Sequence, residues 1–153
     1  EAQLGPRRRI DLAALLASVV ADLSDSGLPV DMAPSAPVVY ECNPSMIKRV
    51  LTNLIENGAK YGQAVRASIA THSSTIDILI DDDGPGIDPA ELERVFQPFY
   101  RLEGSRARET GGIGLGLAIA RSAVEAHGGS LTLRNRQDGG LTAQISLPVQ
   151  NQP

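Results

Sequence analysis

The segment TNLIENGAKYG, residues 52–62, determines how the rest of the chain is interpreted. Each residue of an α-helix turns the side-chain direction by about 100°. Asn53, Glu56, Asn57 and Lys60 therefore share one polar stripe of a helix. The neighbouring stripe suits a hydrophobic core, because it consists of Ile47, Val50, Leu51, Leu54 and Ile55.

Three glycine-rich segments follow this helix along the chain. They are DDGPG at residues 82–86, the stretch from Glu103 to Gly112, and GIGLGL at residues 112–117. Glycine lets backbone approach a ligand closely, and N–H groups at the start of a helix favour phosphate. A polar helix edge and these loops together predict a pocket for a phosphorylated ligand.

The composition suits one packed domain and argues against a nucleic-acid partner. The chain has 153 residues, of which 42% are hydrophobic and 3% aromatic, and its net charge is −4. Negative charge repels a polyanion, and aromatic rings for base stacking are scarce. Cys42 is the only cysteine, so we expect an inert core thiol and no internal disulfide. No stretch reaches the roughly 18 apolar residues of a membrane-spanning helix.

Hydrophobic periodicity and turn residues predict the order of helices and strands. Asp11, Asn43 and Asp88 precede predicted helices and suit the N-cap position. Residues 1–9 predict a polar tail or linker, and residues 102–112 predict a mobile loop. The helices are predicted over 12–26, 44–62, 88–96 and 115–126, and the strands over 30–32, 38–41, 65–69, 76–80, 131–133 and 141–149. We therefore expect an α/β two-layer sandwich, with a mixed, mostly antiparallel sheet covered on one face by helices.

The triplet Asp81, Asp82 and Asp83 follows the alternating strand at residues 76–80. Alternate residues of a strand share a face, so Asp82 is expected to point inward with the isoleucines. Its two neighbours are expected to point the opposite way, which makes one carboxylate of the triplet different.

These residues suit a magnesium–nucleotide. The side-chain oxygen of Asn57 is a neutral ligand of the hardness that magnesium prefers, and Lys60 lies one turn further on for a phosphate oxygen. Backbone N–H groups of residues 112–117 suit the phosphates. An inward Asp82 can accept a hydrogen bond from the exocyclic amine of adenine, which guanine lacks at that position.

Each feature also has an ordinary structural explanation. The asparagines could be solvated helix residues, the three aspartates a charged strand end, the glycine-rich runs simple turns, and Arg106 and Arg108 surface charge. His72 and His127 lack a metal-ligand companion, which favours surface or capping roles. The sequence contains no P-loop, no complete dinucleotide fingerprint and no Gly-x-Ser-x-Gly elbow. The ordered set, rather than any single member, favours a nucleotide site.

Four segments, in order and spacing, resemble the motifs of sensor histidine kinases. Residues 53–61 (NLIENGAKY) resemble the N box, and residues 82–87 (DDGPGI) resemble the first glycine box. Residues 96–101 (FQPFYR) resemble the F box, and residues 112–118 (GIGLGLA) resemble the second glycine box. The resemblance covers about residues 10–149 and has an actinobacterial character. It implies the Bergerat ATP-binding fold, which type II topoisomerases, mismatch-repair ATPases and heat-shock chaperones share.

The resemblance implies ATP and Mg²⁺ as cofactors and a role for each matching residue. Magnesium is expected on Asn57, adenine on Asp82, phosphates near Lys60 and the second glycine box, and an ATP lid over residues 102–111. The implied ATP-binding residues are Asn53, Asn57, Lys60, Tyr61, Asp82, Gly84, Gly86, Ile87, Gly112, Gly114, Leu115, Gly116 and Leu117. The implied catalytic residues are Asn53, Glu56, Lys60 and Arg101. The implied lid residues are Arg106, Arg108 and Thr110.

One departure from the wider superfamily indicates the type of reaction. Its ATP hydrolases resemble this helix but carry a glutamate where Asn53 stands, and that glutamate activates water. An amide cannot accept the proton. Asn53 therefore favours a kinase, with Glu56 as a candidate base toward the incoming imidazole.

The resemblance implies the catalytic domain of a sensor histidine kinase. Residues 1–9 are expected to link it to a preceding dimerisation region, residues 10–149 to form the ATP-binding domain, and residues 150–153 to be a C-terminal tail. The domain is expected to phosphorylate a histidine on the dimerisation domain, for relay to an aspartate of a response regulator. Neither His72 nor His127 lies in such an acceptor motif, so the fragment is not expected to phosphorylate itself.

We expect this fragment to be monomeric, and the full-length protein to be a homodimer anchored in the bacterial inner membrane with this domain in the cytoplasm. Two other functions remain open. An anti-sigma-type protein-serine kinase would have the same fold, although residues 96–101 and the linker-like start argue against it. A binding module without ATP is the second, and Asn57, Asp82 and the glycine boxes argue against that.

Overall fold

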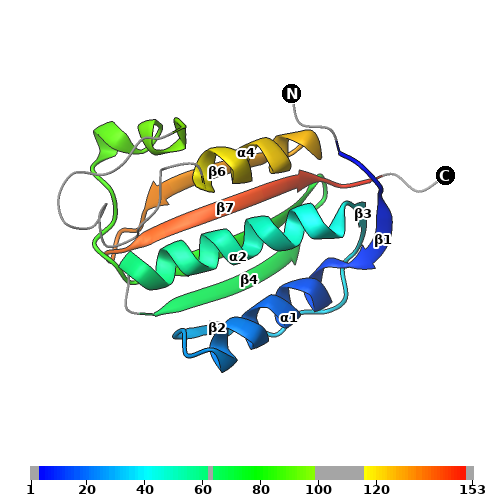
Figure 1. The fold of residues 1–153 in the computed structure, drawn as a ribbon, viewed down its shortest axis with the longest axis horizontal. Coiled ribbons are helices and arrows are strands. Elements are labelled where there is room, and N and C mark those ends of the chain that lie inside the picture. The colour runs from blue at the N-terminus through cyan, green and yellow to red at the C-terminus, as the bar shows by residue number, and fades with distance from the viewer. Residues whose placement is uncertain (1–3, 62–63, 99–115, 151–153) are drawn as a thin grey trace.

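The computed structural model describes residues 4–61, 64–98 and 116–150. Within these residues, three α-helices cover one face of a five-stranded sheet, as Figure 1 shows. The helices are α1 (Leu12–Asp25), α2 (Pro44–Tyr61) and α4 (Gly116–Ala126). The strand order is β2 (Val30–Met32), β4 (Val65–Thr71), β5 (Thr75–Asp82), β7 (Leu141–Pro148) and β6 (Ser130–Asn135).

The sheet is mixed. β2 and β4 are parallel, whereas β4–β5, β5–β7 and β6–β7 are antiparallel pairs. The predicted two-layer sandwich is therefore confirmed, and so is the hairpin of β6 and β7. Gly139 and Gly140 in its turn have φ angles of +98° and +96°, a left-handed conformation that glycine adopts without strain.

The core lies between the helices and the sheet. On α2, the predicted aliphatic stripe is buried, and Ile47, Leu51 and Ile55 are 0% exposed. On β5, burial alternates residue by residue, which places Ile76, Ile78, Ile80 and Asp82 on the inward face. Each element thus presents apolar residues at its own period, and their removal from water stabilises the fold by roughly 25 cal/mol per Å².

The surroundings of Cys42 and the helix N-caps at Asp11 and Asn43 are as the sequence predicts. Cys42 is fully buried, and burial raises the pKa of its thiol to about 11. Asp11 Oδ1 accepts hydrogen bonds from the N–H groups of Ala13 and Val38, at 3.0 and 2.9 Å. Asn43 Oδ1 accepts from the Ser45 N–H at 3.1 Å. The bonds from Ala13 and Ser45 satisfy N–H groups that the first helical turn leaves unpaired, and the bond from Val38 links Asp11 to the residue before β3.

Residues 8 and 9 of the predicted polar tail or linker form part of a strand that the sequence did not predict. Arg8 and Arg9 begin β1 (Arg8–Asp11), which pairs antiparallel with β3 (Val39–Cys42) in a separate two-stranded sheet. The pairing of β1 depends on β3, a partner about thirty positions away. The polar arginines on this exposed strand also give no alternation of apolar and polar residues from which a strand could be predicted.

The predicted helix over residues 88–96 is also wrong as a continuous element. Asp88 caps it as expected, but the segment forms two single 3₁₀ turns, η1 (Pro89–Glu91) and η2 (Arg94–Phe96). Only Val95 and Phe96 of these turns are buried. A short segment with so little core contact does not repay the cost of starting an α-helix. The predicted mobile loop at 102–112 and the helix end at Gly62 lie outside the described residues.

Candidate functional site

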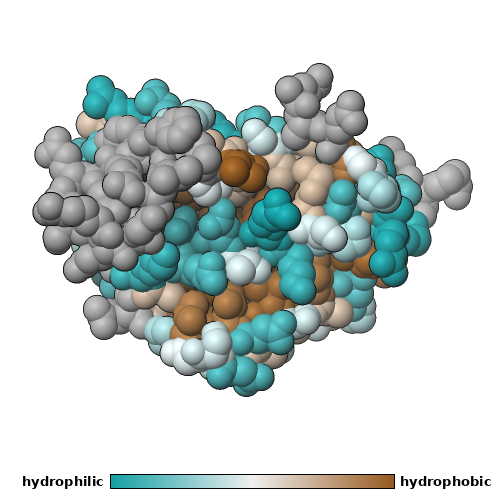
Figure 2. Space-filling model, viewed as in Figure 1, coloured by the Kyte–Doolittle hydropathy of each residue, from teal (hydrophilic) through white to brown (hydrophobic). Residues whose placement is uncertain are grey.

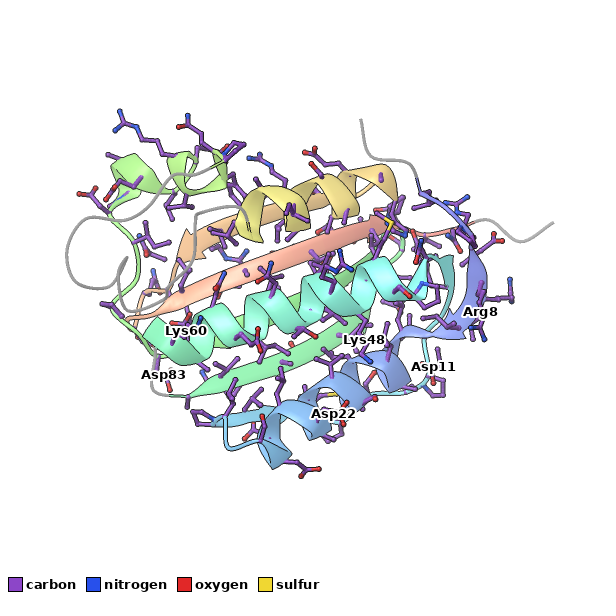
Figure 3. All side chains as sticks on the ribbon, viewed as in Figure 1. Arg8, Asp11, Asp22, Lys48, Lys60 and Asp83 are labelled. Atoms are coloured by element: carbon purple, nitrogen blue, oxygen red, sulfur yellow. The ribbon has the colours of Figure 1, made fainter. Side chains whose placement is uncertain are left out.

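The C-terminal end of α2 packs against the C-terminal end of β5. A Cβ atom on Gly58 would lie 3.4 Å from Asp82 Oδ2 and 3.2 Å from Val65 Cγ2. Gly58 directly follows Asn57, which is partly buried. In Figure 3, Lys60 from the same turn and Asp83 beside Asp82 lie toward one end of the molecule. The structure therefore brings the N-box turn and the first glycine box together.

Asp82 is buried, with 6% of its surface exposed. Its Oδ1 accepts a hydrogen bond from the Gly84 N–H at 2.8 Å. Burial raises the pKa of the Asp82 carboxyl, and the Gly84 N–H partly opposes this shift. A buried carboxylate gains from any additional hydrogen-bond donor, so this environment suits a ligand that carries an amine.

The two neighbouring acids lie in different surroundings. The Thr142 hydroxyl donates to Asp81 Oδ1. Asp83 is exposed and pairs with Arg66 at 3.4 Å and with Arg136 at 3.0 Å, and hydrogen bonds from these guanidinium groups lower the pKa of the Asp83 carboxyl. The prediction that one acid of the triplet differs from the others is confirmed.

Asn53 connects α2 to the start of α4. Its Nδ2 donates a hydrogen bond to the Gly116 carbonyl oxygen at 3.0 Å. A Cβ atom on Gly116 would lie 3.0 Å from Asn53 Nδ2, a tight contact, so glycine at residue 116 leaves room for the Asn53 side chain. The N box and the end of the second glycine box are thus in direct contact.

Glu56 and Lys60 are exposed on the outer edge of α2. Figure 2 shows hydrophilic side chains in a band over this helix, with hydrophobic surface on either side. The edge that the helical spacing predicts as polar is therefore accessible to solvent.

Phe96, the first residue of the F box, is held against α4. It is 5% exposed, and the Arg121 guanidinium carbon lies 4.3 Å from the centre of its ring. Arg121 also pairs with Glu93 at 3.2 Å. This cation–π contact fixes the 3₁₀ turn η2 beside the helix that follows the second glycine box.

A groove with a volume of about 410 Å³ lies between α2 and α4. Its walls are mostly apolar and include Met46, Val50, Ile119 and Ala123, and Asn53 lies in the same lining. Ile119 is 49% exposed. Because Asn53 lines the groove, the groove borders the candidate site.

The two histidines have the roles that the sequence predicts. His72 is exposed and lies 3.3 Å from Asp77. His127 is 5% exposed, its Nε2 accepts from the Asn43 N–H at 3.1 Å, and its Nδ1 lies 2.7 Å from the Ala123 carbonyl. Within the described ranges, no group of three potential metal-ligating His, Cys, Asp or Glu residues occurs, and no helix there is long and apolar enough to span a bilayer.

The structure also brings two residues to the site that the sequence interpretation missed. Asn135 bonds the backbone of Ile87, and Arg136 bonds the backbone carbonyl of Asp82. The one sequence signal was their position just before the Asp138–Gly140 turn, which does not reveal where the turn packs. The predicted residues Arg101, Arg106, Arg108, Thr110, Gly112, Gly114 and Leu115, and the side chain of Tyr61, lie outside what the structure describes.

Comparison with known proteins gives a consistent result. Residues 42–151 match the family described as histidine kinase-, DNA gyrase B-, and HSP90-like ATPases. The sensor histidine kinase GtrS of Pseudomonas aeruginosa is 37% identical over 139 residues, which are 91% of this chain and 28% of that protein. The sensor histidine kinase CpxA of Escherichia coli is 36% identical over 134 residues, which are 87% of this chain and 29% of that protein. The chain thus spans less than a third of these relatives.

A solved structure gives the same picture. The ATP-binding domain of PrrB from Mycobacterium tuberculosis superposes with a TM-score of 0.79 at 26% identity, over 95% of this chain and 98% of that one. This similarity supports the type of domain and does not identify the chain as PrrB. With the fold, the contact between the N box and first glycine box, and these relatives in agreement, the chain belongs to the family of histidine kinase-, DNA gyrase B-, and HSP90-like ATPases, as a catalytic domain of the sensor histidine kinase type.

Proposed function

We propose that this domain binds ATP together with magnesium and donates the γ-phosphoryl group to a histidine on a separate dimerisation domain. The observation that carries the proposal is the packing of Gly58 against Asp82, which sets the Asn57 turn of α2 beside one buried acid. The named sensor histidine kinases among the relatives support the kinase activity.

Asp82 is the residue to which we assign adenine. Its carboxylate is buried and accepts a hydrogen bond from the Gly84 N–H. The exocyclic amine of adenine would supply a further donor, whereas a carbonyl at that position would face the carboxylate oxygen with no proton between them. Asp82 then selects adenine over guanine by charge and polarity.

Asn57 fits a magnesium ion that the phosphates also hold. Its amide oxygen is neutral and hard, and magnesium usually takes only one or two protein groups beside phosphates and water. When bound, the ion neutralises phosphate charge. Lys60, one turn further along α2, adds a positive charge for the phosphates, and backbone N–H groups at the start of α4 suit phosphate oxygens.

Asn53 disfavours transfer of the phosphoryl group to water. Its side-chain amide has no group that can accept a proton from water. Its Nδ2 donates to Gly116 O, so we assign it the role of holding α2 and the start of α4 together around the nucleotide. Slow hydrolysis of ATP by the isolated domain follows. Glu56, exposed on the same helix, is the proposed base toward the incoming imidazole.

A binding titration tests the assignment of magnesium to Asn57 and of adenine to Asp82. We expect Asn57→Ala to weaken binding of a non-hydrolysable ATP analogue in magnesium, and to remove most of the difference between buffers with and without the ion. Asp82→Asn should lower the preference for the adenine analogue over its guanine counterpart by about tenfold, the loss of one hydrogen bond to a charged group. Asp81→Asn, on the outward face, is the matched control.

Parent-like magnesium dependence in Asn57→Ala would refute the metal assignment. An unchanged base preference in Asp82→Asn would refute the adenine assignment. Each result leaves the other assignment standing, because the two variants report on different parts of the nucleotide.

The transfer step is tested with the acceptor supplied separately. We expect no radiolabel on this fragment alone when it is incubated with γ-labelled ATP. Label should appear on an added histidine-bearing dimerisation domain from the same full-length protein, and then on its response regulator. Label on a serine of an added protein would instead support the anti-sigma-type serine kinase.

The remaining proposals concern the longer protein. We propose that residues 1–9 lead from the dimerisation region, that residues 10–149 form the catalytic domain, and that residues 150–153 are a tail. The longer protein is then a membrane-anchored homodimer with this domain in the cytoplasm, and a response regulator is its partner. The relatives, which are called sensor histidine kinases and are more than three times as long as the matched region, support this arrangement.

A further inference from the structure

The end of the β6–β7 hairpin, residues 135–140, lies against the first glycine box, residues 82–87. Asn135 contacts Ile87 through both ends of its amide. Its Oδ1 accepts from the Ile87 N–H at 2.8 Å, and its Nδ2 donates to the Ile87 carbonyl at 2.7 Å. An amide side chain thus pairs with one backbone residue as a neighbouring strand would, which holds the C-terminal end of the glycine box.

Arg136 holds the other end of the same box. Its Nη1 donates to the Asp82 carbonyl oxygen at 3.2 Å and to Asp83 Oδ1 at 3.0 Å. Its side chain is 26% exposed, so part of its stem is removed from solvent. Arg66, which lies on β4, also pairs with Asp83. The guanidinium therefore bonds the backbone of the acid whose side chain points into the site.

Two glycines allow this contact. A Cβ atom on Gly140 would lie 2.0 Å from the Asp82 carbonyl oxygen, and one on Gly86 would lie 2.5 Å from Asn135 Oδ1. Both distances are far below any van der Waals contact, so larger residues would displace the hairpin end from the box. Gly139, the adjacent residue, has a similar φ of +98° but no atom within 4 Å of the Cβ position.

The turn is itself closed by hydrogen bonds. The Arg136 N–H donates to the Gly140 carbonyl at 3.0 Å, and the Gly139 N–H donates to the Arg136 carbonyl at 3.2 Å. The residues that bond the glycine box therefore belong to one small closed unit. Its contacts at residues 82 and 87 lie on either side of Gly84 and Gly86 along the chain.

We propose that Asn135 and Arg136 are positioning residues for Asp82, and that the hairpin end thereby determines how strongly the site prefers adenine. This inference rests on the proposed function, in which Asp82 accepts a hydrogen bond from the base. A shift of the box moves the carboxylate relative to the base, whereas contacts to the phosphates come from α2 and the start of α4. Loss of the hairpin contacts therefore affects base preference more than phosphate binding.

The test compares affinities for a non-hydrolysable ATP analogue and its guanine counterpart. Gly140→Ala and Gly139→Ala form a matched pair, because both add a methyl group at a left-handed φ, yet only the first collides with Asp82. We expect the adenine-to-guanine preference to fall about tenfold in Gly140→Ala and to stay at the parent value in Gly139→Ala. Thermal unfolding of each variant measures the general loss of stability.

Side-chain variants keep the proposal testable if Gly140→Ala does not fold. We expect Arg136→Gln and Asn135→Ser to lower the base preference, and Arg136→Lys to retain part of it because a lysine still donates to a carbonyl oxygen. Equal weakening of both analogues, or no change in their ratio, would show that the hairpin end only supports the fold and would overturn the proposal.

Asp82→Asn distinguishes a failure of the positioning role from a failure of the adenine assignment. If Asp82→Asn lowers the base preference and the hairpin variants do not, only the positioning role fails. If Asp82→Asn leaves the preference unchanged, the adenine assignment itself fails.

Discussion

Burial distinguishes Asp82 from the two acids beside it. All three residues are the same amino acid, yet Asp83 is exposed to two guanidinium groups and Asp82 is enclosed under α2. The direction of the pKa shift follows from these surroundings, downward for Asp83 and upward for Asp82. A single residue type thus serves as a surface ion-pair partner at one position and as a buried hydrogen-bond acceptor at the next.

The raised pKa of Asp82 gives a pH dependence for nucleotide binding. The carboxylate form is the stronger acceptor for the adenine amine, and in the free protein burial shifts the pKa of Asp82 upward from its ordinary value near 3.8. As pH falls, protonation of Asp82 competes with the base, so affinity should begin to fall at a higher pH than for an ordinary aspartate.

Calorimetric titration of the ATP analogue from pH 8 to pH 4 measures this dependence. Asp82→Asn is the control, because it retains the titration of the nucleotide phosphates and lacks the carboxyl group. Identical pH profiles for the parent and the variant would contradict the expectation.

The Asn53 amide gives a second expectation for a single residue. Asn53→Asp replaces the Nδ2 donor with an oxygen that faces the Gly116 carbonyl, which sits 3.0 Å from the present donor. We expect about 1–3 kcal/mol less stability from this repulsion and lost hydrogen bond, with weaker binding of the ATP analogue. Chemical denaturation measures the stability, and Lys48→Gln, exposed on the same helix, is the control. If Asn53→Asp were as stable as the Lys48→Gln control, this expectation would be contradicted.

At the scale of elements, His127 connects the C-terminal end of α4 to the N-cap of α2. With Nε2 accepting from the Asn43 N–H, the ring is neutral and its Nδ1–H donates to Ala123 O. Asn43 in turn donates from Nδ2 to the Leu4 carbonyl at 2.7 Å. Asn43 and the buried His127 ring therefore link the N-terminal segment, the start of α2 and the end of α4.

This connection makes stability depend on pH. Desolvation lowers the pKa of His127 in the folded protein, and the charge of Arg7 adds to that shift. The unfolded chain therefore binds the proton more readily, and the free energy of unfolding should fall as pH drops through the ordinary histidine value near 6.5 toward the lower folded value.

Urea denaturation at pH 7.5 and pH 5 measures the effect. His127→Gln keeps an acceptor near the Asn43 N–H and cannot gain the proton, so its stability should change less between the two pH values. His72→Gln, at an exposed position, is the matched control. The idea fails if the parent and His127→Gln lose stability equally.

At the scale of the whole molecule, the two ends of the described chain are joined through β3. The hydroxyl of Tyr40, which is 2% exposed, donates to the carbonyl of Pro148, the last residue of β7, at 2.9 Å. The Gln150 side chain bonds both the N–H and the carbonyl of Glu41, at 2.9 and 2.7 Å. Figure 1 shows β7 ending close to β1 and β3, at one end of the molecule.

This closure predicts a modest and specific loss of stability. Tyr40→Phe keeps the buried ring and removes the hydroxyl, so the Pro148 carbonyl loses a partner. We expect the free energy of unfolding to fall by about 1 kcal/mol, with parent-like affinity for the ATP analogue, because the site lies at the other end of α2. Thermal and urea unfolding measure the first quantity, and reduced nucleotide affinity would contradict the second.

The sequence predicted much of the candidate site because its signals are local. The polar and aliphatic stripes of α2 repeat at the helical period, and the inward direction of Asp82 follows from strand alternation with the isoleucines before it. The four motifs that resemble sensor histidine kinases then predict which polar edge and which glycines belong together. The hairpin of β6 and β7 also follows from a local turn signal.

What the sequence alone determined is therefore most of the elements, the faces they bury and the type of domain, since each depends on residues only a few positions apart. The tertiary structure alone decided the contacts between distant segments. It pairs β1 with β3, joins His127 to Asn43 across 84 positions and sets Asn135 against Ile87 across 48 positions. It also limits residues 88–96 to two 3₁₀ turns. No periodic pattern encodes such contacts, because they arise only when packing of the apolar faces brings the polar ends of the elements together.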